Sequence, residues 1–103
     1  MKKKTKHPSP REYRIRYRIN GALEESTQYY NIFHSSEALD FLAHTYRRGH
    51  IHGGKLRILG VEEYDPYKKL WEDRTAMAAE HAESPEVSAQ GDKIFLKAPG
   101  DGV

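Results

Sequence analysis

The segment REYRIRYRIN, residues 11–20, constrains the fold more than any other part of the chain. From residue 13 to residue 19, apolar side chains alternate strictly with arginines: Tyr13, Ile15, Tyr17 and Ile19 against Arg14, Arg16 and Arg18. A period of two predicts a β-strand with one buried face and one exposed face. We therefore expect a strand that packs its apolar face on a core and presents three arginines on the other.

A β-hairpin is predicted directly after this strand. Asn20 and Gly21 tolerate positive φ and suit a tight turn. Residues 25–33, ESTQYYNIF, are rich in the aromatic and β-branched residues that strands favour. The phase of this second strand is open, because the pairs that can face inward are either Tyr30 with Ile32 or Tyr29 with Phe33.

An amphipathic helix follows the hairpin. Ser35 and Ser36 offer an N-cap. The apolar residues then recur at helical spacing: Ala38, Leu39, Leu42 and Tyr46. Arg47 and Arg48 lie where a helix C-terminus favours cations, and Gly49 can adopt the left-handed conformation that ends a helix.

A third strand and a second helix are predicted next. The third strand covers residues 55–64, KLRILGVEEY, with Gly60 as a bulge that shifts its phase. Asp65 suits a helix cap and Pro66 a first helical position, so the second helix is expected from Pro66 to about Ala79. The polar residues beyond it predict a linker. The short apolar run KIFLK, residues 93–97, is expected to add an edge strand or to pack on the core.

These elements predict one small α+β domain with the order ββαβα. A right-handed crossover through the first helix places strand three beside strand one, which gives a three-stranded antiparallel sheet in the order 2-1-3. One helix is expected on a face of this sheet. The predicted boundaries are a disordered basic tail at 1–10, the domain at 11–80, and a mostly flexible polar tail at 81–103 that contains the apolar run 93–97.

The composition excludes several kinds of chemistry. The chain has no cysteine, which rules out disulfides, thiolate metal sites and cysteine catalysis. No apolar run approaches the roughly 20 residues that cross a bilayer. The basic first residues lack the apolar segment of a secretory signal. We therefore expect a cytoplasmic protein.

The segment GHIHGGK, residues 49–55, has the glycine and lysine spacing of a nucleotide-binding P-loop. A P-loop follows a strand and opens a helix, so that amides converge on the phosphates. Here the order is reversed, and Leu56 stands where a hydroxyl holds magnesium. We therefore expect no nucleotide cofactor at this loop.

The histidines and serines do not form a convincing metal or catalytic pattern. Zinc needs three or four converging ligands, and the pair His50 and His52 has no carboxylate close in sequence. His44 and His34 lie on or just before the first helix. The one Ser/His neighbourhood, at His34, lacks an implied third member. We expect no metal and no catalytic activity.

An uneven charge distribution suggests an anionic partner. Residues 1–60 carry a net charge of +7, and residues 61–103 carry −5. Arginine contacts phosphate and stacks on bases, tyrosine stacks on bases, and the lysine-rich first residues add sequence-independent attraction. We expect weak, sequence-tolerant binding of RNA or single-stranded DNA by an arginine-lined sheet face and the helix-to-strand loop. The candidate residues are Arg14, Arg16, Arg18, Arg47, Arg48, Lys55 and Arg57.

Two alternatives remain open at this stage. The arginines can instead pair across strands with Glu24, Glu25, Glu62 or Glu63, or lie beneath the second helix, opposite Glu72 and Asp73. The chain can also be a protein-interaction or homodimerisation module. That module would use an edge of the third strand or of KIFLK, with Tyr67, Leu70 and Trp71 as anchors.

Overall fold

The computed structural model describes residues 9–19, 23–48, 55–91 and 93–96. The elements in this part of the chain are β1 (Arg11–Ile19), β2 (Ser26–Ile32), α1 (Ser35–Arg47), β3 (Leu56–Asp65), β4 (Leu70–Asp73), α2 (Thr75–His81), β5 (Val87–Gln90) and β6 (Lys93–Leu96). The predicted α+β class is confirmed, with two helices and an antiparallel sheet among the described residues. The sheet has six strands, however, and not the three that were predicted.

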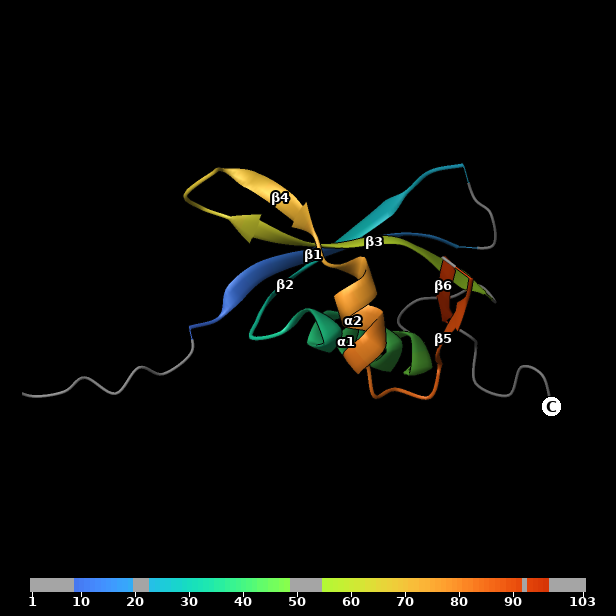
Figure 1. Ribbon diagram of the computed structural model, residues 1–103. Coiled ribbons are helices and arrows are strands. Elements are labelled where there is room, and N and C mark those ends of the chain that lie inside the picture. Colours follow the sequence, from blue (N-terminus) through green and yellow to red (C-terminus); the bar gives the residue numbers. More distant parts are fainter. Residues whose placement is uncertain (1–8, 20–22, 49–54, 92, 97–103) are drawn as a thin grey trace, which may run out of the picture.

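The sheet is built around β1 and β3. β1 pairs with β2 on one edge and with β3 on the other, which is the predicted order of the first three strands. The far edge of β3 is shared, because β6 pairs with one end of it and β4 with the other. β5 completes the sheet beside β6. Figure 1 shows both helices on one side of this sheet, which we call the helix face; the opposite side is the outer face.

The alternation in β1 divides its side chains between the two faces as predicted. Tyr13, Ile15 and Tyr17 are buried on the helix face, and the arginines between them are half-buried on the outer face. Residues directly opposite each other in a sheet share a face, so Tyr30, opposite Tyr13, faces the helices. The open phase of the second strand is thereby settled, and Tyr29 points outward.

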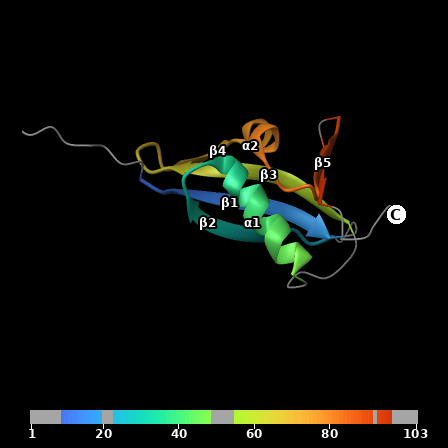
Figure 2. The same ribbon diagram turned by 90° about the horizontal axis from the view of Figure 1, so that it is seen from below.

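The core lies between the helix face and the two helices. α1 contributes its apolar stripe, including the fully buried Leu39 and Leu42, and β3 contributes Leu56 and Val61. Viewed from the helix side in Figure 2, α1 runs across the sheet with α2 beside it. α2 adds only Ala78 to the buried set. No helix in the described part of the chain is long and apolar enough to span a membrane.

The first helix begins one residue earlier than its serines suggest. His34 is the N-cap, and its Nδ1 accepts a hydrogen bond from the Ser36 N–H at 3.1 Å. Glu37 reaches back to accept the His34 N–H at 2.9 Å. This reciprocal pair is a capping box, in which the Glu at the third helical position fixes which residue caps. Ser35 and Ser36 are therefore the first helical residues and do not cap the helix.

The predicted helix from Pro66 to Ala79 is wrong over most of its length. Asp65 does accept the Tyr67 and Lys68 N–H groups, as a helix cap would. Lys69 then adopts a left-handed conformation with φ 58°, and the next four residues return as β4 along β3. An Asp-Pro pair suits a tight turn as well as a helix start, so α2 begins only at Thr75.

The C-terminal residues also hold more structure than the sequence predicts. Residues 93–96 of the predicted apolar run form β6, which pairs with β3 and buries Ile94 and Leu96, and residue 97 lies outside the described residues. β5 lies in the stretch predicted as a linker and pairs with β6. The predicted basic tail at 1–10 and the loop glycines at 49–54 fall largely outside the described residues.

Gly91, in the turn between β5 and β6, is expected to resist replacement by alanine. Its φ of 64° is left-handed, and no atom lies within 4 Å of an added Cβ, so the penalty is conformational alone. Gly91→Ala should lower the free energy of unfolding by about 1–2 kcal/mol in urea titrations. Gly91→Asn, which tolerates this conformation better, should lose less. Equal losses in the two variants would contradict this account.

Candidate nucleic-acid interface

The outer face of the sheet is where the structure places most of the predicted arginines. The three arginines of β1 lie there, and the register puts Arg57 of β3 on the same side. The second helix does not cover these arginines in the described structure, as one alternative had it, because α2 lies on the helix face (Figure 1). The outer face has two parts that differ in their residues, one beside β4 and one beside β6.

Arg14 belongs to an aromatic cluster beside β4. Its Nε lies 2.6 Å from Glu62 Oε1, and its guanidinium carbon lies 4.2 Å from the centre of the Trp71 ring. Tyr29 and Tyr64 surround Trp71, with ring centres 6.1 and 5.1 Å away. Arg14 is therefore both neutralised and stacked, and it attaches β4 to the sheet.

Arg16 is neutralised as well. Its Nε lies 3.2 Å from Glu62 Oε1, and its Nη1 lies 3.3 Å from Glu25 Oε1. The guanidinium extends over Gly60, where a Cβ would come within 3.0 Å of Arg16 Nη2. The cross-strand pairing considered as an alternative therefore holds for Arg14 and Arg16.

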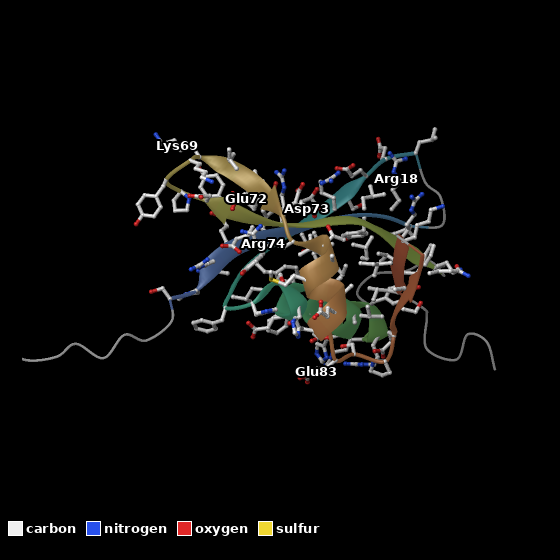
Figure 3. The ribbon with its side chains drawn as sticks, in the orientation of Figure 1. Arg18, Lys69, Glu72, Asp73, Arg74 and Glu83 are labelled. Carbon is white, nitrogen blue, oxygen red and sulfur yellow. The ribbon has the colours of Figure 1, made fainter. Side chains whose placement is uncertain are left out.

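A different arrangement lies beside β6, which we call the basic row: Arg18, Lys55, Arg57 and Phe95. Arg18 and Arg57 are directly opposite each other on neighbouring strands, and Phe95 is directly opposite Arg57 on the next. Like charges in such positions repel. Figure 3 shows Arg18 on the side of the sheet away from the helices.

The described contacts of the basic row include a backbone carbonyl and an aromatic ring. Arg57 is exposed and makes no ion pair among the described residues. Arg18 Nη1 donates to the neutral Leu23 carbonyl at 2.9 Å. Lys55 Nζ lies 4.6 Å from the centre of the half-exposed Phe95 ring. The row thus combines three cations with an aromatic ring.

The remaining predicted residues, Arg47 and Arg48, lie at the end of α1 and not on the outer face. Arg47 Nη1 is 2.7 Å from Glu86 Oε2, and this ion pair neutralises the charge of Arg47. Arg48 is exposed at the helix C-cap. The predicted set of seven residues is therefore divided between the two sides of the sheet.

Phe95 is the one member of the row that is not among the residues predicted from the sequence. In KIFL the residues Ile94 and Leu96 alternate with Phe95, which is the signal that places Phe95 outward once β6 is recognised. Trp71 was predicted on a helix, but it lies in β4 with its ring in the Arg14 cluster.

A buried carboxylate, Glu63, organises the opposite end of the molecule, on the helix face. It accepts hydrogen bonds from Arg11 Nη1 at 2.8 Å, Arg74 Nε at 3.2 Å and the Tyr13 hydroxyl at 3.2 Å. Burial opposes its ionisation, but the hydrogen bond and charge of Arg11 and the charge of Arg74 outweigh burial and hold the pKa of Glu63 below its ordinary value. Glu63 therefore holds these arginines in place as an ionised partner.

The histidines show no metal-binding geometry in the described part of the chain. No group of three or more His, Asp or Glu side chains there is arranged to hold a metal ion. His50 and His52 lie outside the described residues. His34 Nδ1 is 2.9 Å from Ser36 Oγ, but the same nitrogen caps the helix, so this contact belongs to the N-cap.

The comparisons with known proteins give no functional lead. The chain matches no known family model, and no curated protein or solved structure is significantly similar to it. The geometry of the outer face is therefore the basis for a function.

Proposed function

We propose that the chain binds single-stranded nucleic acid, RNA or DNA, weakly and with little sequence preference, through the basic row. The supporting observation is the register that sets Arg18 directly opposite Arg57. A phosphate between two guanidinium groups relieves their repulsion and accepts charge-assisted hydrogen bonds from both. No described helix lies over this side of the sheet (Figure 1), so an extended single strand of nucleic acid has access to it.

Phe95 supplies a stacking surface beside these cations. The ring lies next to Arg57 in register and is half-exposed. Stacking of one base on an aromatic side chain contributes about 1–3 kcal/mol and tolerates any base. A base that stacks on Phe95 displaces the Lys55 ammonium from the ring, and that ammonium then reaches a neighbouring phosphate. The lysines among residues 2–6 add salt-dependent attraction without sequence preference.

The test is a fluorescence titration of a short labelled single strand at several salt concentrations. If three phosphates are neutralised, the log–log salt slope should be about −2. The double variant Arg18→Gln with Arg57→Gln should bind roughly tenfold more weakly and bring the slope towards −0.7. Phe95→Ala should weaken binding with little change in slope, because it removes stacking and no charge.

A matched control removes the same charge elsewhere. The control is the double variant Lys68→Gln with Lys69→Gln. These two lysines lie in the turn between β3 and β4, at the other end of the sheet. The control should bind like the unmodified chain, as should Arg14→Gln if Glu62 already neutralises Arg14. If the Lys68/Lys69 variant weakened binding as much as the Arg18/Arg57 variant, the loss would reflect only the lower net charge of the protein and not a specific site. Binding that depends only on residues 2–6 would refute the basic row as a site.

A further inference from the structure

β2 presents an open and unprotected strand edge. It lies at one end of the sheet, and no described strand pairs with its outer edge. Its seven residues, STQYYNI, include no charged residue and no proline. Edge strands are usually short, charged, proline-containing or covered, because their free backbone groups pair with any available strand. The other open edges, on β4 and β5, are only four residues long.

Aromatic side chains lie exposed along the same edge. Tyr29 is 60% exposed on the outer face, and Phe33, just beyond β2, is 55% exposed. On the helix face, Phe41 of α1 is 46% exposed and stacks on Tyr30 with ring centres 6.0 Å apart. The apolar surface thus continues from the strand edge onto the helix. Continuity of this kind is typical of an interface.

The edges that the sequence suggested for association are used within the chain. β3 pairs on both sides, and β6 lies between β3 and β5. Trp71 is half-buried in the Arg14 cluster. Tyr67 is nearly fully exposed, but it lies in the turn between β3 and β4, away from β2.

We propose that β2 pairs antiparallel with β2 of a second copy, about a two-fold axis at Tyr29, to form one continuous sheet. A register centred on Tyr29 is the one that pairs all seven residues of the strand. It sets Tyr29 opposite its own equivalent and Gln28 opposite Tyr30. Glu25 falls opposite Phe33, so no like charges meet along the seam.

The self-complementarity of β2 favours a second copy over another partner. A two-fold interface uses the same patch on both subunits, and an uncharged strand meets itself without electrostatic repulsion. A two-fold axis perpendicular to the sheet puts both α1 helices on the same side, so Phe33 and Phe41 of the two copies flank the seam. The inference does not depend on nucleic-acid binding, although the dimer would present both basic rows on one face.

The absence of cysteine makes a direct test possible. Tyr29→Cys introduces a single thiol on the proposed axis. Directly opposite residues in an antiparallel pair have Cα atoms about 4.5–5.5 Å apart, within the range of about 4.4–6.8 Å that a disulfide spans. Thr27→Cys is the matched control on the same face of the same strand. In this register Thr27 opposes Asn31, so its equivalents lie roughly 13 Å apart.

The expected result is a covalent dimer of Tyr29→Cys after mild oxidation, and none of Thr27→Cys. Sedimentation of the unmodified chain should show a concentration-dependent dimer, which Tyr29→Lys abolishes and Tyr67→Lys does not. Circular dichroism checks that each variant is folded. A chain that stays monomeric at every concentration, or cysteine variants that cross-link equally, would overturn the proposal. Neither the cross-linking nor the sedimentation experiment involves nucleic acid. A negative result would therefore contradict the dimer without bearing on nucleic-acid binding by the basic row.

Discussion

Replacing Leu96 with alanine is expected to lower the free energy of unfolding by about 2–5 kcal/mol, the range for truncating a fully buried leucine. Leu96 has no exposed surface, and it lies opposite Leu56 of β3 and Val87 of β5. The truncation leaves a cavity at the junction of three strands. Well-packed strands close such a cavity only partly, so both the lost burial and the void contribute.

Urea unfolding followed by circular dichroism measures this loss. Lys93→Ala is the matched control, because Lys93 is exposed on the same strand. It should change stability by no more than about 0.5 kcal/mol. If residues 93–96 belonged to a flexible tail and not to the sheet, neither variant would matter. A loss for Leu96→Ala as small as that of the control would favour the flexible tail over β6.

The long periodic segments were the ones that the sequence predicted well. Strict alternation over residues 13–19 assigned both the strand and its two faces, because a one-residue slip would expose Ile15 and bury Arg14. The stripe of α1 was equally informative, with Leu39 and Leu42 fully buried as expected. Both segments are long enough for their period to be unambiguous.

The short strands β4 and β5 were missed because four residues carry too little pattern. Leu70 and Trp71 fit a helical stripe as well as a strand, and only the left-handed Lys69 after the Asp65 turn directs them back along β3. β5 has small and polar residues, and pairing with β6 gives it its structure. Such strands depend on their neighbours in the sheet, which a single sequence does not display.

The candidate site depends on register in the same way. The outward arginines of β1 were predictable, but their partners were not. Up to Arg16 the pairing with β3 is regular, and a shift between Arg16 and Tyr17 then skips Leu59. Without that bulge, which the sequence placed at Gly60, Arg18 would oppose Ile58 in place of Arg57. One extra residue in β3 thus places an arginine, and not an isoleucine, opposite Arg18.

Replacing Glu63 with glutamine should lower the free energy of unfolding at neutral pH by about 1–3 kcal/mol, the cost of leaving buried polar groups poorly matched. Glu63 is only 8% exposed, and it accepts from two arginines and the Tyr13 hydroxyl. The amide removes the negative charge between Arg11 and Arg74, and its NH₂ group replaces one of the two acceptor oxygens, facing either Arg11 or Arg74 and Tyr13. Glu80→Gln, at a largely exposed carboxylate on α2, is the matched control and should have little effect.

The pH dependence identifies the charge of Glu63 as the cause. Burial alone would raise its pKa, but the hydrogen bond and charge of Arg11, with the charge of Arg74, hold the folded-state pKa below the ordinary 4.5. A lowered folded-state pKa means that the ionised group stabilises the fold above the unfolded pKa and loses this effect as pH falls through the folded value. The stability difference between the unmodified chain and Glu63→Gln should therefore be full at pH 7 and shrink steadily below about pH 4.5. Urea titrations across that window measure it. A difference that stays constant with pH would mean that Glu63 acts through shape and hydrogen bonding alone.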